Sequence, residues 1–166
     1  MQLSDHFVRN NLSPKHIFTR IGINTGEMVV GNMGTQQKMD YTIMGNSVNL
    51  ASRLEGVNKQ YGTWILVSEE TFKEAGEAFV TRQMDPVRVM GIEQPVRLYE
   101  LIDERAAVDD ATLEAVELFH RGQALYEERR FEEAIEQFRK VQAVLPGDGP
   151  SEIFIKRCQK YQEQCN

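Results

Sequence analysis

The sequence lacks any long apolar run, and this absence excludes a helix that crosses a membrane. No stretch approaches the roughly 18 uninterrupted apolar residues that such a helix needs. The N-terminus also lacks the apolar core of a secretory signal, because charged residues interrupt it. Cysteine is scarce, and on a helix the spacing of Cys158 and Cys165 would hold them about 10 Å apart, too far for a disulfide. We therefore expect a reduced, cytoplasmic protein, although a longer parent chain can still carry a membrane anchor.

Positive charge is in short supply as well. The 166 residues contain 19 Lys and Arg against 25 Asp and Glu, which gives a formal net charge of −6. This balance argues against a general nucleic-acid binder but leaves room for one small phosphate site. With 41% hydrophobic and 27% charged residues, the chain can build a packed core and is not wholly disordered.

The composition changes near residue 103. Up to Ile102 the chain holds 10 basic and 11 acidic side chains, and from Asp103 onward it holds 9 and 14. Most glycines and short β-branched runs fall in the first part, whereas the second reads as helix. We therefore predict an α/β unit over 1–102, a linker over 103–110 and a small all-α unit over 111–166.

The first part predicts strands and helices in mixed order. Alternating apolar residues over 17–24 indicate a strand, which we expect to form a hairpin with 28–30. Ser47 can cap a helix that runs to about Gln60 and is closed by Gly62. The remaining predictions are a polar loop over 34–38, strands at 64–67, 86–89 and 96–101, and a short helix starting at Ser68.

A glycine cluster in this part is a candidate phosphate-binding loop. Gly26 and Gly31 have the spacing of a P-loop, but Asn32 stands where that motif requires lysine. A Gly-x-Gly-x-x-Gly fingerprint is also missing. On this pattern alone, glycines that serve a hairpin turn are the better interpretation.

Two polar residues in the helix over 47–60 suggest a ligand site. Asn49 and Arg53 are four apart and share one helical face, where an amide and a guanidinium can hold a sugar and a phosphate. Thr42 joins this face if the preceding strand leads directly into the helix. The alternative is that Arg53 pairs with a carboxylate such as Glu55 or Asp40 while Asn49 faces water.

Several motifs occur in order and resemble the C-terminal portion of a class III nucleotidyl cyclase catalytic domain. The resemblance covers about residues 18–101 and is specific, because the spacing between the motifs also agrees. The motifs are Arg20-Ile-Gly-Ile-Asn-Thr-Gly26, Val30-Gly-Asn-Met-Gly34, Asp40-Tyr-Thr-Ile-Met-Gly45, Val48-Asn-Leu-Ala-Ser-Arg-Leu-Glu55 and Pro95-Val-Arg-Leu-Tyr-Glu-Leu101.

The resemblance implies a fold, a reaction and three site residues. The fold is an α+β, ferredoxin-like core whose first strands are missing here. The reaction converts ATP to 3′,5′-cyclic AMP and pyrophosphate, through attack of the ribose 3′-hydroxyl on the α-phosphate. By position, Thr42 would read the purine and is typical of adenylate cyclases, Asn49 would orient the ribose, and Arg53 would stabilise charge on the phosphate. Asn49 and Arg53 are thus the implied catalytic residues.

The family's metal site is not recognisable in this chain. Members hold two Mg²⁺ or Mn²⁺ ions on two aspartates in motifs that belong upstream of Met1. Asp5 and Asp40 do not sit in matching motifs, so we predict no metal ligand and no bound cofactor for this chain alone.

A phosphate-binding lysine of the family is also absent. Val89-Met-Gly-Ile92 replaces a run that often contains two lysines. Arg88 and Arg97 are the available substitutes.

These departures lead to two function hypotheses. In the first, the chain is part of an adenylate cyclase that offers half a site, makes no cyclic AMP alone, and dimerises or swaps domains by β-pairing near 17–32. In the second, it is a non-catalytic regulatory or protein-interaction module.

The second part resembles one tetratricopeptide repeat, although a generic helical hairpin is the alternative. Gly122 and Ala134 are the small residues that let two helices cross closely, and a third helix over 149–164 would cover the remaining face. Such a repeat packs on a neighbour or binds a protein partner. The matching positions, counted from Ala115, are Leu118, Gly122, Leu125, Phe131, Ala134, Phe138, Val141 and Pro146.

Overall fold

The computed structural model describes residues 9–10, 15, 18–87 and 95–165. Its mixed order of strands and helices confirms the predicted α+β class. The elements are β1 (Ile21–Ile23), β2 (Val29–Thr35), β3 (Lys38–Met44), α2 (Asn46–Tyr61), β4 (Ile65–Ser68), α3 (Glu69–Ala75), the 3₁₀ turn η1 (Gly76–Ala78), β5 (Phe79–Val87), β6 (Val96–Glu104), α4 (Asp110–Glu127), α5 (Phe131–Val144) and α6 (Gly149–Cys165).

Four strands form a sheet in the order β1-β4-β6-β5, and β2 and β3 form a separate hairpin. β1 runs parallel to β4, and the other sheet pairs are antiparallel. The predicted hairpin between 17–24 and 28–30 is therefore wrong. The two-residue turn at 36–37 pairs β2 with β3 locally, while α2 provides the crossover that two parallel strands require.

The helix ends follow the local chemistry in part. Gly62 ends α2 in the left-handed region at φ 72°, where glycine carries no steric penalty, as expected. Ser68 caps α3 by accepting a hydrogen bond from the Thr71 N–H, which confirms the predicted start. Ser47 does not cap α2, because the helix begins at Asn46 after Gly45 and already includes Ser47.

Three helices, α4, α5 and α6, form the C-terminal tail. Aromatic rings fill the space between them, with Phe119 in contact with Phe138 and Phe154 at centroid distances of 5.3 and 5.4 Å. A Cβ at Gly122 would lie 2.8 Å from the Phe138 ring, so glycine permits this close helix crossing. Burial raises the pKa of the Cys158 thiol to about 11, and the Cys165 side chain lies outside the described residues.

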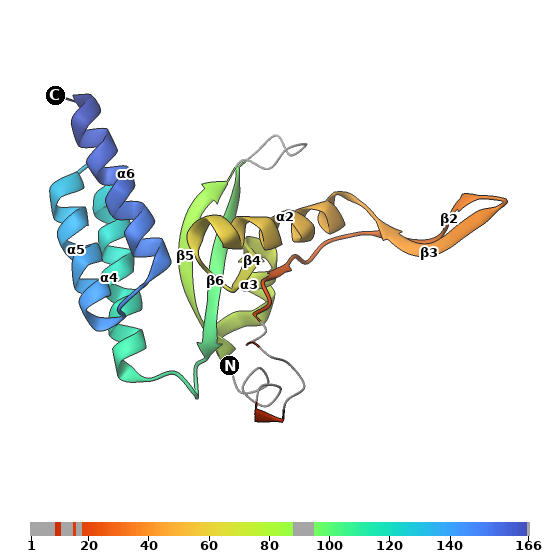
Figure 1. Ribbon diagram of the computed structural model, residues 1–166, viewed down its shortest axis with the longest axis horizontal. Coiled ribbons are helices and arrows are strands. Elements are labelled where there is room, and N and C mark those ends of the chain that lie inside the picture. The colour runs from red at the N-terminus through yellow and green to blue at the C-terminus, as the bar shows by residue number, and fades with distance from the viewer. Residues whose placement is uncertain (1–8, 11–14, 16–17, 88–94, 166) are drawn as a thin grey trace.

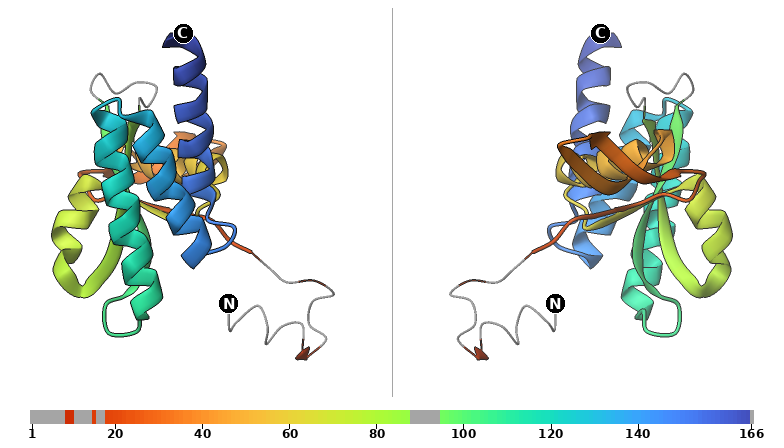
Figure 2. Two further views of the ribbon diagram at one scale, coloured as in Figure 1. Left: turned by 90° about the vertical axis from the view of Figure 1, so that its left-hand side faces the viewer. Right: turned by 90° about the vertical axis from the view of Figure 1, so that its right-hand side faces the viewer.

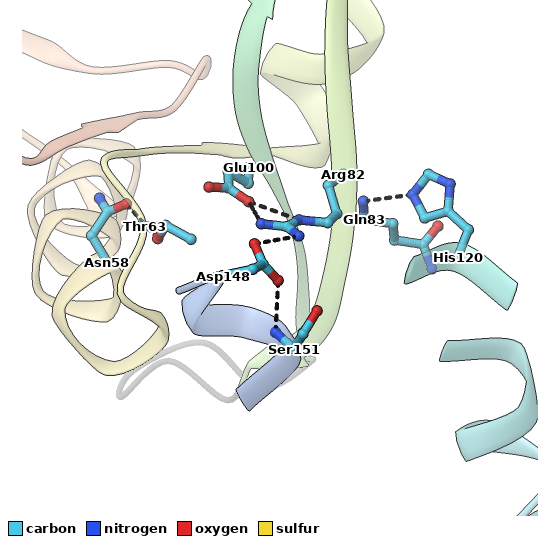
Figure 3. Close-up of polar contacts among 8 residues, drawn as sticks. All are labelled: Asn58, Thr63, Arg82, Gln83, Glu100, His120, Asp148 and Ser151. Atoms are coloured by element: carbon cyan, nitrogen blue, oxygen red, sulfur yellow. Dashed lines mark hydrogen bonds and ion pairs between the residues drawn. The ribbon is translucent and has the colours of Figure 1, made fainter. Parts of the chain in front are cut away.

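The tail and the sheet share one hydrophobic core that also includes α2. β6 extends two residues into the predicted linker, and α4 begins at Asp110. At the junction, the buried Arg82 of β5 donates to Glu100 of β6 through Nε at 2.9 Å and pairs with Asp148 at 2.8 Å (Figure 3). Its guanidinium lies over the Phe119 ring at 4.5 Å.

The tail and the β2–β3 hairpin lie at opposite ends of the molecule (Figure 1). The two end-on views show the three tail helices facing the viewer on one side and the hairpin on the other (Figure 2). Within the described part of the chain, no helix combines the length and apolarity that a bilayer crossing requires.

Candidate functional site

Helix α2 carries Asn49 and Arg53 beside its buried face. That buried face consists of Leu50, Leu54, Asn58 and Tyr61. Asn49 is exposed and Arg53 is half-buried, so neither is sealed in the core. The structure thus brings these two residues one turn apart on the same side of the helix, where a ligand can reach them.

The position of α2 is fixed by a close approach to β1. A Cβ at Gly22 would lie 2.3 Å from the Ala51 carbonyl oxygen, so a larger residue would push the helix off the strand. This glycine belongs to a motif that the sequence suggested, but its packing role becomes visible only in the structure.

Buried polar contacts hold the same helix in register. The Asn58 amide donates to the carbonyls of Ile21 and Leu54 at 2.8 and 3.1 Å, and its Oδ1 accepts from the Thr63 hydroxyl at 2.8 Å (Figure 3). Asn58 is fully buried and satisfied, which makes α2 a rigid support for Asn49 and Arg53. Sequence reasoning missed Asn58, although an amide on the apolar face of a helix was a usable signal.

Thr42 lies on the hairpin rather than on α2. β3 ends at Met44, two residues before α2 begins, so the strand does lead into the helix. However, the hairpin projects away from the sheet, and Thr42 is exposed on it (Figure 1). Its partner across the ladder is Gly31, whose missing side chain leaves open space on the same face. The structure therefore keeps Thr42 accessible on the hairpin that leads into α2, and not on the helix face that Asn49 and Arg53 share.

A hollow of about 410 Å³ lies beside the start of α2. Asn46, Ser47 and Arg97 line it together with the carboxylates of Glu69 and Glu70. Arg97, one of the two expected substitutes for a phosphate-binding lysine, is therefore accompanied by acidic groups that oppose phosphate. Arg88, the other substitute, lies outside the described residues.

Metal ligands do not gather in the part of the chain that the structure describes. No three His, Cys, Asp or Glu residues there come together as a cation site. Asp40 is exposed on the hairpin opposite Met33, and Asp5 lies outside the described residues. The residues present do not fit the two-metal site of the family.

The surface around the hairpin is apolar and exposed. We name as the apolar arm a set of six hairpin side chains that are 46–75% exposed: Val29, Val30, Met39, Tyr41, Ile43 and Met44. In the four-stranded sheet, β1 is an edge strand whose Ile21 and Ile23 are also exposed. A two-stranded ribbon is marginal by itself, so this arm has the character of a surface that a partner covers.

Comparison with known proteins points in one direction. A family model described as the adenylate and guanylate cyclase catalytic domain matches residues 1–103. The chain is 37% identical over 144 residues to the terminal-differentiation-specific adenylate cyclase of Dictyostelium discoideum, covering 84% of this chain and 7% of that protein. It is 38% identical over 91 residues to adenylate cyclase 1 of Rhizobium meliloti, covering 55% of this chain and 14% of that protein. The chain thus spans only a small part of the length of these relatives.

A solved structure shows the same likeness. The crystal structure of the adenylyl cyclase CyaB from P. aeruginosa is 34% identical to this chain with a TM-score of 0.50, covering 65% of this chain and 57% of that one. The Dictyostelium match covers too much of this chain to end at residue 103. The similarity to that protein therefore extends into the helical tail.

Proposed function

Because this chain belongs to the adenylate and guanylate cyclase catalytic-domain family, we propose that it supplies the nucleotide-positioning side of a site that converts ATP to 3′,5′-cyclic AMP and pyrophosphate. One observation carries the proposal: Asn49 and Arg53 lie together on an accessible side of the rigid helix α2, next to the base of an exposed hairpin. The names of the relatives cited above favour ATP over GTP.

The path from β3 into α2 follows the order of the parts of a nucleotide. Thr42 comes first, and its hydroxyl can hydrogen-bond a purine edge. Asn49 follows and can hold the ribose, while Arg53 lies about 6 Å further along the helix axis. That step suits the distance from a ribose to its phosphates. Arg53 offers a planar fork of donors to the phosphoryl oxygens, and these donors stabilise charge as the 3′-hydroxyl attacks.

A second protomer that carries the family's two aspartates would complete this site. The apolar arm and the edge strand β1 expose the surfaces that such a partner would cover, which supports a homodimer or domain-swapped oligomer. The described residues do not form a site for Mg²⁺ or Mn²⁺. A second copy of this chain would cover these surfaces without supplying the carboxylates, so a partner that carries both aspartates is needed, and the isolated chain is expected to make no cyclic AMP.

In this proposal, the tail is a helical unit fused to the cyclase part of the chain. The close approach of Gly122 to the Phe138 ring supports the tetratricopeptide-like interpretation of the tail. The tail packs against the sheet with a shared core, which favours a cyclase piece with an attached tail over a free interaction module. Cys158 is a free, buried thiol, in keeping with a cytoplasmic location.

Complementation with a homologous cyclase domain tests the proposal. The chain is mixed with a domain that carries both aspartates but has its own Asn and Arg equivalents replaced by alanine. The chain alone should form no cyclic AMP from Mg-ATP or Mn-ATP, and the mixture should form it. Arg53→Ala should lower the rate of the mixture by about 100- to 1,000-fold, the loss seen when one charge-stabilising donor is removed.

A matched arginine controls for surface charge. Arg121→Ala removes an exposed guanidinium on α4, far from the site, and should leave the rate of the mixture unchanged. Turnover by the chain alone that disappears in Arg53→Ala would show that the half-site interpretation is wrong. A mixture that forms no cyclic AMP with wild-type chain, although the two proteins associate, would contradict the proposed role in the reaction.

A further inference from the structure

A second hollow lies between the sheet and the tail, away from Asn49 and Arg53. It has a volume of about 320 Å³, within the range of small-molecule sites. Phe72 of α3, Thr81 and Gln83 of β5, and Tyr99 of β6 line it on the sheet side. Helix α4 closes the other side, so the hollow exists only where the tail meets the sheet.

An unpaired polar group marks this hollow. Gln123 of α4 lines it and is only 3% exposed, yet its side-chain nitrogen has no hydrogen-bond partner among the described residues. Burying an amide N–H₂ without a partner costs about 1–3 kcal/mol. A ligand that presents an acceptor atom to Gln123 would remove this cost.

His120 is a second polar side chain that lines the same hollow. Its Nε2 accepts the backbone N–H of Gln83 at 3.2 Å, so in the neutral ring Nδ1 carries the proton (Figure 3). Burial, and then the nearby Arg82 charge, lower the pKa of His120, which keeps the ring neutral near pH 7. Two neutral polar side chains of α4 therefore line the hollow, since positions 120 and 123 are three apart and share one helix face.

The opposite wall is aromatic. Phe72 and Tyr99 stack with centroids 4.0 Å apart and an interplanar angle of 10°. Such flat side chains favour a planar ligand. Among the described lining residues there is no lysine or arginine, and Glu127 contributes a carboxylate. A phosphate-bearing ligand would be repelled here, in contrast to the site proposed on α2.

We propose that this hollow binds a neutral, planar heteroaromatic molecule of nucleobase size, with ring acceptors directed at Gln123 and His120. The ligand would touch α3, β5 and β6 on one side and α4 on the other, and would thereby tie the tail to the sheet. The site is independent of the cyclase reaction, and its test needs no turnover.

Adenine, a neutral planar base, serves as the probe. Titrating it into the ¹⁵N-labelled full chain should shift the side-chain N–H₂ signals of Gln123, which are identified by their absence in Gln123→Met. That variant keeps the side-chain length, removes the donor, and should weaken adenine binding at least tenfold. It should fold well, because it removes an unpaired buried amide. Gln142→Met, the same change on α5 outside the hollow, should bind adenine like the wild type.

Three results would overturn the proposal. One is wild-type chain whose Gln123 signals do not move up to millimolar adenine. Another is equal adenine binding by Gln123→Met and wild type, which would place the probe elsewhere. The third is adenosine monophosphate shifting the Gln123 signals as strongly as adenine, because a site without a cation should disfavour the phosphate.

Discussion

The tail–sheet junction and the hairpin end of this molecule differ in the kind of side chain that each buries and exposes. At the junction of the tail and the sheet, charged groups are buried: Arg82 is 4% exposed and is shared between Glu100 and Asp148. At the hairpin end, apolar groups are exposed, and Tyr41 has the largest exposed fraction in the apolar arm, 75%. Each arrangement is costly by itself, since buried charges need partners and exposed apolar surface needs a cover.

The two regions differ in whether their side chains find partners within this chain. The junction has its partners within the chain, because Asp148 both pairs with Arg82 and accepts the Ser151 N–H at the start of α6. A second cluster repeats the arrangement, with Arg157 of α6 bonded to Asp85 of β5 and to the Tyr61 hydroxyl of α2. The apolar arm has no comparable cover among the described residues, so its partner is a second chain in our proposal.

Replacing Arg82 should have the largest effect. Arg82→Met leaves the carboxylates of Glu100 and Asp148 buried without their cation, which typically costs about 3–5 kcal/mol. Although burial opposes it, the two carboxylates raise the pKa of Arg82, in keeping with a firmly charged group. Urea unfolding of wild type and variant measures the loss in free energy of unfolding.

An exposed ion pair provides the control for this variant. Lys140→Met removes the partner of Glu136 on the surface of α5 and should change stability by less than about 0.5 kcal/mol. Equal losses in the two variants would mean that the junction is no more than a surface contact.

The second prediction tests the apolar arm. Tyr41→Ser combined with Ile43→Ser should weaken self-association about 100-fold while leaving the unfolding of the monomer nearly unchanged, because both side chains are exposed. Analytical ultracentrifugation over a concentration series measures the association. Tyr161→Ser removes another exposed aromatic residue, on the tail, and should not alter it. Dimers of the double variant that are as stable as wild type would place the interface elsewhere.

Two glycine substitutions should change the free energy of unfolding by smaller amounts and in opposite directions. A Cβ at Gly122 would meet the Phe138 ring at 2.8 Å, so Gly122→Ala should destabilise the chain by about 1–3 kcal/mol. Gly56, inside α2, has nothing within 4 Å of an added Cβ, and Gly56→Ala should stabilise by about 0.5–1 kcal/mol. Thermal unfolding compares the two. Stabilisation by both substitutions would mean that helix propensity, and not packing against Phe138, decides the effect at Gly122.

The sequence predicted well what depends on local chemistry. Gly62 and Ser68 end and start helices as expected, since their roles follow from φ and from a side-chain acceptor. Asn49 and Arg53 share one side of α2 because helical spacing alone determines it.

Strand pairing was the main failure, and its cause is nonlocal. β1 pairs with β4, more than forty residues further along the chain, so nothing within its own segment indicates that choice. The register of β5, which extends far beyond the predicted strand, likewise depends on β6 and on Arg82 meeting Glu100. The hollow at the junction could not be predicted either, because Gln123 lines it only when α4 packs on the sheet.

The smallest predicted effect concerns acidification of the junction. The pKa of His120 is lowered by burial and by Arg82, with Glu117 partly opposing, so the folded chain binds this proton less readily than the unfolded chain does. The contribution of neutral His120 to the stability of the fold is then complete above its unfolded pKa of about 6.5 and is lost as the pH falls below that value. Protonation of Nε2 would also remove the acceptor for the Gln83 N–H. His120→Gln should flatten the decline in melting temperature between about pH 7 and 5, and parallel curves for the two proteins would contradict this.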